Sequence, residues 1–77
     1  MGEKKDLFKI SMVHQGRTYT AYYREERGEI VLFQQLATKK ATRHRTDTPV
    51  GLATALLFEL VVREGRGVPD LDLGTTD

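Results

Sequence analysis

The sequence predicts an α+β fold, in which an antiparallel meander of three to four β-strands precedes one C-terminal helix packed on one sheet face (ββββα). Apolar residues alternate with a period of two over the first half of the chain, as in half-buried strands. After residue 48 they recur at about 3.6 residues, the helical period. The 77 residues, 39% of them apolar, suit one domain with a small core.

The first two strands are predicted on either side of a turn at Gln15-Gly16, where glycine supplies the positive φ that a two-residue hairpin turn needs. Such a turn pairs three apolar residues of the first strand with three of the second, in reverse order. Turn chemistry and apolar pattern therefore put the same six side chains on one face. These residues are Phe8, Ile10, Met12, Tyr19, Ala21 and Tyr23.

A third strand is predicted over residues 29–34, after a second turn at Arg27-Gly28. Its apolar residues alternate ambiguously, because Ile30 and Leu32 point one way and Val31 and Phe33 the other. A loop with an even number of residues places the first pair opposite Tyr23 and Ala21 on the core face, whereas a three-residue loop with a bulge inverts the strand. Even parity is expected, because it also brings Leu36 into the core.

Residues 38–46 form either a fourth strand or a helical turn. Thr38, Thr42 and Thr46 are β-branched and favour a strand. The spacing of Leu36, Ala37, Lys40, Ala41 and His44 fits a helix equally well. We interpret the segment as a short edge strand.

A helix is predicted to begin at Thr48-Pro49, because threonine suits the N-cap and proline the first helical position, and to end at Gly65. One apolar stripe should lie on the strands: Leu52, Ala53, Leu56, Leu57, Leu60 and Val61. A second stripe of Ala55, Phe58 and Val62 lies on another side. This helix therefore needs two surfaces to pack against, and the second stripe is the candidate interface of a homodimer.

The domain organisation expected is a flexible N-terminus over residues 1–6, a single domain over 7–65 and a flexible tail over 66–77. The chain has no cysteine, which excludes disulfides and thiolate zinc sites. No segment has the apolar length of a signal peptide or a membrane span, so no membrane association and a cytoplasmic location are expected.

Catalytic, metal and cofactor motifs are not found. His14 and His44 match no zinc spacing, and Ser11 lacks the glycine elbow of a nucleophile. Glu25 and Glu26 are adjacent on a strand and should point to opposite faces, which does not suit an acid/base pair. The glycines at 65 and 67 follow a helix, whereas a phosphate loop precedes one. We therefore expect no enzyme activity, no cofactor and no small-molecule substrate.

The feature that departs most from average is a basic run between Glu29 and Asp47, a stretch with no acidic residue between its ends. The net charge is only +1, so this asymmetry is local. Aromatic and basic side chains on the outer sheet face would join it in a candidate surface for single-stranded nucleic acid, through stacking and phosphate contacts. Its residues are Lys9, Tyr22, Arg24, Phe33, Lys39, Lys40, Arg43 and Arg45.

The alternative is that Tyr22 and Phe33 only stabilise the sheet as a cross-strand pair or dock on a second subunit, and that the cations protect an edge strand from aggregation. The function expected is accordingly that of a small non-enzymatic binding module, homodimeric, acting through protein–protein interaction or self-association with an exposed sheet face. Binding of single-stranded nucleic acid is the alternative function.

The chain resembles short uncharacterised bacterial proteins in which a strand meander ends in one Leu-rich helix. The residues that carry the resemblance are 16–23, Gly28 to Val31, 39–42, and Pro49 followed by the Leu-rich residues 52–60. The resemblance covers roughly residues 16–62. It implies a bacterial single-domain protein of unassigned function and carries over no active residue. The ββββα order is also similar to the dimeric single-stranded DNA-binding coactivator family, in topology alone, because that family's sequence motif is absent.

Overall fold

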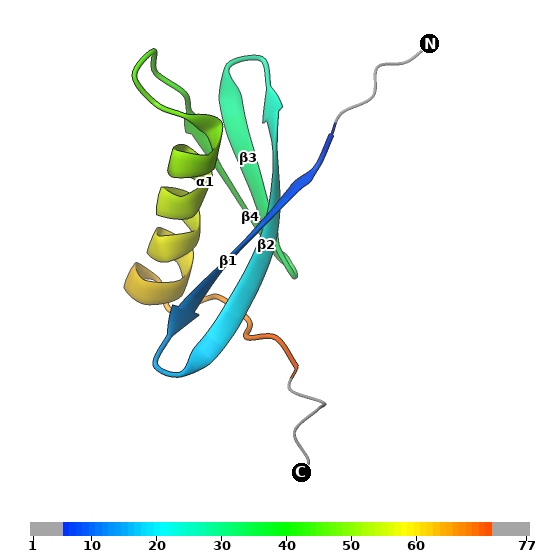
Figure 1. Ribbon diagram of the computed structural model, residues 1–77, viewed down its shortest axis with the longest axis vertical. Coiled ribbons are helices and arrows are strands. Elements are labelled where there is room, and N and C mark those ends of the chain that lie inside the picture. Colours follow the sequence, from blue (N-terminus) through cyan, green and yellow to red (C-terminus); the bar gives the residue numbers. More distant parts are fainter. Residues whose placement is uncertain (1–5, 72–77) are drawn as a thin grey trace.

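Four antiparallel strands form one sheet in the order β1-β2-β3-β4, and one helix follows and packs on the sheet, which confirms the predicted ββββα arrangement (Figure 1). The computed structural model describes residues 6–71. The strands are β1 (Phe8–His14), β2 (Arg17–Glu26), β3 (Glu29–Gln34) and β4 (Ala37–Thr42), followed by helix α1 (Pro49–Phe58) and a π-helical turn η1 (Glu59–Arg63). Most of the predicted N-terminal segment, and residues 72–77 of the predicted tail, lie outside the described residues.

The β1–β2 hairpin has the predicted register, with Met12 opposite Tyr19, Ile10 opposite Ala21 and Phe8 opposite Tyr23. Its turn residues Gln15 and Gly16 both have positive φ, at 54° and 77°. This is the conformation that a two-residue turn matched to the twist of the strands requires. The turn therefore sets the register that the apolar alternation predicts.

The third strand has the predicted even parity, because Arg27 and Gly28 form a two-residue turn. The partners differ by two positions from those expected: Leu32 lies opposite Tyr23, and Ile30 lies opposite Glu25. Both side chains are fully buried on the core face.

Leu36 is not in the core, contrary to prediction, and is fully exposed. The reason is a third two-residue turn at Gln35-Leu36, which ends β3 at Gln34 and places Leu36 at the hairpin tip. Residues 37–42 then form the edge strand, while the rest of the predicted segment is a loop.

The helix begins as predicted, because the Thr48 side chain accepts a hydrogen bond from the Gly51 N–H and Pro49 takes the first helical position. Gly65 follows the π turn with a φ of 65°, which suits a residue without Cβ. The core-facing stripe is confirmed, with Leu52 only partly buried and the other five side chains buried.

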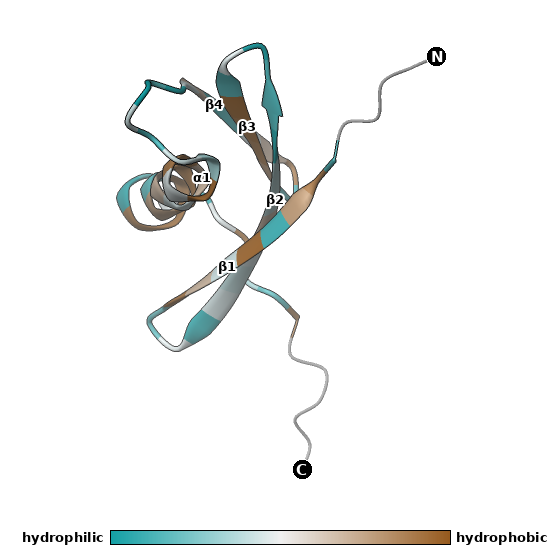
Figure 2. Ribbon diagram, turned by 45° about the horizontal axis from the view of Figure 1, so that its top comes forward, coloured by the Kyte–Doolittle hydropathy of each residue, from teal (hydrophilic) through white to brown (hydrophobic). Residues whose placement is uncertain are grey.

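The core lies between α1 and one face of the sheet, as the end-on view of the helix in Figure 2 shows. Ala21, Ile30, Leu32, Ala53 and Leu57 form its fully buried centre. Ile10, Met12 and Tyr19 pack at its border. Phe8, although it belongs to the same face, is 52% exposed at the far end of β1, where its ring contacts that of Tyr23 at a centroid distance of 5.4 Å.

Candidate functional site

An apolar groove lies between the exposed side of α1 and the edge strand β4. It has a volume of about 680 Å³ and is lined by Ala41, Gly51, Leu52, Thr54, Ala55, Leu56, Phe58, Glu59 and Arg63. Only the last two of these side chains carry a charge. Ala41, Gly51 and Ala55 leave this space open, because larger side chains at these positions would fill it.

Phe58 stands at this groove with half of its surface exposed, at 50%. Ala55 is also exposed and lines the same groove. The third predicted interface residue, Val62, is only partly buried and packs against the core cluster. Val62 lies in the π turn η1, next to Leu60 and Val61, which are buried in the core-facing stripe.

The rim of the groove carries an ion-pair cluster that joins β4 to the helix end. The Lys39 ammonium lies 2.6 Å from a Glu64 carboxylate oxygen and 3.4 Å from one of Glu59. The hydrogen bond to Glu64 raises the pKa of Lys39, and the same bond lowers the pKa of Glu64. Lys39 therefore points to the helix side of the sheet, and the structure does not place it on the outer face with the other candidate nucleic-acid residues.

The outer sheet face carries the aromatic row that the sequence predicted. Lys9 lies opposite Tyr22, and Tyr22 lies opposite Phe33 on the next strand. The Arg24 guanidinium stands 5.2 Å from the centre of the Phe33 ring, within cation–π range. Tyr22 is 44% exposed and can offer its ring to a ligand.

A shallow groove of about 540 Å³ lies on this face, and Asp70 and Leu71 of the C-terminal segment form part of its lining, with Thr20, Tyr22, Phe33 and Gln35. The groove thus places the Tyr22 and Phe33 rings beside an acidic side chain. Its acidic wall at Asp70 is unfavourable to an anion.

The remaining cations are not gathered into one patch. Arg43 donates a hydrogen bond to Glu25 over 2.7 Å, and Glu25 lies on the helix side of β2, the same side as Tyr23. Arg24 pairs with Glu26 at 2.5 Å. Lys40 is exposed on β4 opposite Val31, so it does share the outer face, and Arg45 is exposed in the loop before α1. Carboxylates thus engage three of the six predicted basic residues: Arg24, Lys39 and Arg43.

Sequence reasoning missed a second site, at Gln34. This side chain is 1% exposed, and its amide nitrogen donates to the carbonyl oxygens of Thr20 (3.0 Å) and Val68 (2.8 Å). Its amide oxygen accepts from the Val68 N–H at 2.8 Å. The segment after the helix, predicted as tail from residue 66, is attached to the sheet by these bonds as far as Asp70. Only the polar residue at an inward-facing strand position could have signalled this contact.

Within residues 6–71, no group of three or more His, Asp or Glu side chains lies close enough to hold a metal ion. The same described part of the chain contains no helix long and apolar enough to cross a bilayer. His14 lies at the end of β1 and His44 in the loop before α1. Comparison of the chain with models of protein families, with curated proteins and with solved structures finds no match.

Proposed function

We propose that this chain is a small non-enzymatic protein-interaction module that forms a homodimer through the exposed side of α1 and the groove beside β4. The observation that carries the proposal is the pairing of a protruding apolar side chain with an apolar hollow on one surface. Phe58 is 50% exposed, and it lies beside the hollow that Ala41 and Ala55 leave. The partner that fills the groove is a second copy of the chain.

A twofold axis makes such a surface self-complementary. In an isologous interface each copy presents the same patch, so Phe58 of each copy can enter the hollow of the other. Removal of the exposed half of a phenylalanine from water, about 100 Å², contributes roughly 2.5 kcal/mol, and the symmetry doubles this to roughly 5 kcal/mol. Association also costs translational and rotational entropy, which further contacts at the interface offset. The burial of the two Phe58 rings then supports a dimer of ordinary affinity.

Charge complementarity supports the same occupant. Glu59 and Arg63 are the two charged residues that line the groove, and they are four positions apart on the same side of the helix. When two such helices pack antiparallel, the acid of one copy faces the base of the other. A copy of the chain therefore fits this rim, whereas a partner of uniform charge would leave one of the two residues opposed to a like charge.

The test compares Phe58→Glu with Val50→Glu by sedimentation equilibrium. The two side chains are each 50% exposed on α1, but Val50 does not line the groove. Loss of roughly 5 kcal/mol of apolar burial, with two carboxylates added at the interface, should weaken the dimer by more than about 1,000-fold. Val50→Glu should associate as the wild type does.

Circular dichroism and a urea titration should find both variants folded, because neither position belongs to the core. A wild type that stays monomeric at millimolar concentration contradicts the proposal. An equal effect of both substitutions would also contradict the proposal, because it would show that self-association does not depend on the groove.

The second candidate function is binding of single-stranded nucleic acid on the outer sheet face. It is favoured by the aligned row of Lys9, Tyr22 and Phe33, with the Arg24 guanidinium over the Phe33 ring. Exposed rings on a sheet can stack on bases, and cations beside them can contact phosphates. The ion pairs of Lys39 and Arg43 leave Lys9, Lys40 and Arg45 as the cations on which such binding would depend, which is why this function ranks second.

A further inference from the structure

The sheet has two edge strands, and they differ in how well they are protected from further pairing. Among residues 6–71, β1 pairs with β2 alone and β4 with β3 alone. β4 carries two adjacent lysines, Lys39 and Lys40, and Arg43 follows directly after it. Such charges discourage pairing at an edge. β1 has seven residues without proline or glycine, and Lys9 is its only permanent charge, so β1 is the edge that is open to another strand.

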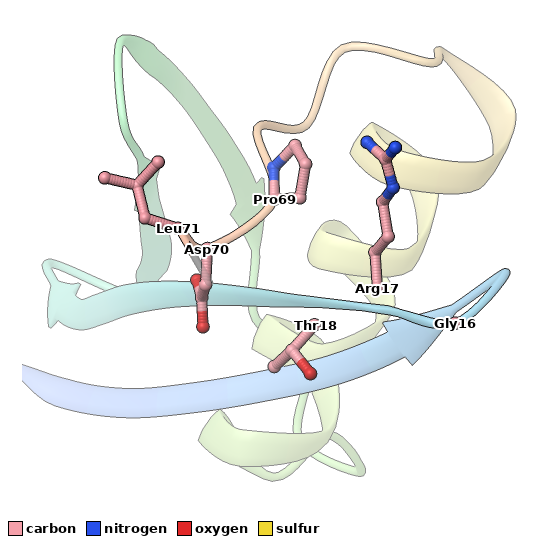
Figure 3. Close-up of a pocket in the computed structure, with 6 residues that line it drawn as sticks. All are labelled: Gly16, Arg17, Thr18, Pro69, Asp70 and Leu71. Carbon is pink, nitrogen blue, oxygen red and sulfur yellow. The ribbon is translucent and has the colours of Figure 1, made fainter. Parts of the chain in front are cut away.

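The backbone groups that β1 leaves free follow from the hydrogen bonds on the far side of β2. The Thr18 carbonyl accepts from the Asp70 N–H at 2.8 Å, and the Thr20 carbonyl accepts from the Gln34 amide at 3.0 Å. Figure 3 shows Asp70 and its neighbours on the side of β2 away from β1. Because backbone groups alternate in direction along an antiparallel pair, the β1 partners of the two threonines point their own N–H and C=O groups away from β2. The residues with outward backbone groups are therefore every second one: Leu7, Lys9, Ser11 and Val13.

The apolar core is incompletely covered along the same edge. On the core face of β1, Phe8 is 52% exposed, and Ile10 and Met12 are only partly buried. By contrast, the β2 partners Ala21 and Tyr23 are 0% and 7% exposed. One more strand would therefore cover the border that β1 leaves open, as β1 itself covers β2.

A second copy of β1 fits this edge in one register. Two copies that pair antiparallel about a twofold axis at Ile10 bring outward backbone groups opposite each other along the strand. On the outer face, Leu7 of each copy then faces Val13 of the other, and these side chains are 54% and 69% exposed in the single chain. On the core face, Phe8 faces Met12, and the two isoleucines face each other. Every apolar side chain at the edge thus meets another apolar side chain.

The charged side chains favour the same register. With the axis at Ile10, Lys9 faces Ser11, and Asp6 faces His14. An axis at Lys9 would instead place the two ammonium groups directly opposite each other, which is unfavourable. An axis at Ser11 would place the lysine opposite a valine and the histidine opposite a phenylalanine. The edge is therefore complementary to a copy of itself, and this complementarity identifies the partner.

We propose that β1 is a second self-association interface, at which two copies of the chain pair edge to edge and form one continuous antiparallel sheet. The interface shares no residue with the α1 groove, so it does not depend on the dimer proposed above. The pairing buries only a narrow strip, and we expect a Kd of about 0.1–1 mM, weaker than that of the α1 dimer. Because a chain with two different twofold interfaces can bind two neighbours at once, it assembles beyond the dimer at high concentration.

The test uses a background in which the α1 dimer is disrupted. Phe58→Glu provides it and leaves β1 unchanged, and Ala55→Glu at the same groove replaces it if the first variant does not fold. Sedimentation equilibrium at concentrations up to about 2 mM should still detect a dimer of this variant.

Opposite charges at one position of β1 then test the register. Ser11 is exposed and faces Lys9 of the other copy, and the symmetry makes this pair twice. At low salt, Ser11→Glu should therefore strengthen the dimer about fivefold, and Ser11→Lys should weaken it about fivefold. Thr38 is exposed on the other edge strand, so the same two substitutions at Thr38 are the matched control and should leave the Kd unchanged.

The wild-type chain supplies an independent measurement. In a sample at millimolar concentration that mixes labelled and unlabelled chains, isotope-filtered spectra should show an NOE between the α-protons of Phe8 in one copy and Met12 in the other. These two residues form a pair without hydrogen bonds, in which the α-carbons of antiparallel strands lie closest.

Three results would overturn the proposal: a Phe58→Glu variant that is monomeric at about 2 mM, equal association of the two Ser11 variants, or intermolecular NOEs that leave β1 out. Failure of the α1 dimer gives a different result. In that case Phe58→Glu associates as tightly as the wild type, and the association of both depends on the charge at Ser11.

Discussion

Replacement of Gln34 by leucine should destabilise the domain more than any other change of a polar side chain. Gln34 is 1% exposed and its amide takes part in three hydrogen bonds, with Thr20 and with both backbone groups of Val68. Leucine has nearly the same size but can neither donate nor accept. The substitution therefore isolates the hydrogen bonds from the packing.

The expected loss can be worked from these bonds. Each contributes about 1 kcal/mol net, and a buried backbone group left without a partner costs about 1–3 kcal/mol more. Water can reach Val68, which is partly exposed, so the larger penalty falls mainly on the Thr20 carbonyl. The apolar surface that leucine buries offsets part of this cost. We expect a net loss of about 2–4 kcal/mol, a large fraction of the stability of a small domain.

Urea denaturation measures this loss as a lower midpoint, and hydrogen exchange locates it. The Val68 and Asp70 amides, which donate to Gln34 and Thr18, should lose protection in the variant. Gln35→Leu is the matched control, because Gln35 is exposed in the adjoining turn, and it should change stability by less than about 0.5 kcal/mol. A Gln34→Leu variant as stable as the control, with Val68 still protected, would show that the Gln34 hydrogen bonds do not hold the segment to the sheet.

Two further outcomes follow from the charged residues. Lys39→Gln should lower the free energy of unfolding relative to the wild type at neutral pH. The difference should vanish as pH falls through the folded-state pKa of Glu64, which lies below its ordinary 4.5. It should also vanish as pH rises through the folded-state pKa of Lys39, which lies above 10.5. Urea titrations across pH check this. If the outer face binds single-stranded oligonucleotides, Lys40→Ala should weaken binding and flatten its salt dependence, whereas Arg43→Ala should change it little because Glu25 already engages Arg43. Fluorescence anisotropy at several salt concentrations separates these results.

The parts of the fold that could be predicted depend on local signals. Glycine at the second position of two turns and strict alternation around Gln15-Gly16 specify the first hairpin and its register. Thr48 and Pro49 mark the helix start for equally local reasons. The third turn contains no glycine, and of its two residues only Gln35 has a positive φ. The sequence therefore does not mark this turn, and Leu36 continues the apolar pattern of β3 as if it belonged to the core.

The parts that could not be predicted depend on residues distant in the sequence. Lys39 lies opposite Leu32 on the helix side of the sheet, because successive residues of a strand face opposite sides, and there it meets Glu64, which is 25 positions later. Gln34 is buried because Val68 returns to it from 34 positions away. Val62 packs against the core cluster and does not line the groove, although Ala55 and Phe58 of the same predicted stripe do. Apart from the polar residue at the inward-facing position 34, the sequence does not mark the partners of these residues, because the contacts form only when the helix lies on the sheet.

Intermolecular contacts of Phe58 test the proposed dimer most directly. In a sample that mixes labelled and unlabelled chains, isotope-filtered NOE spectra report only contacts between copies. We expect NOEs from the Phe58 ring of one copy to the methyl groups of Ala41 and Ala55 of the other, because these side chains line the groove. A sample at millimolar concentration that shows no such NOEs, or shows intermolecular NOEs only to the outer sheet face, would contradict the proposal.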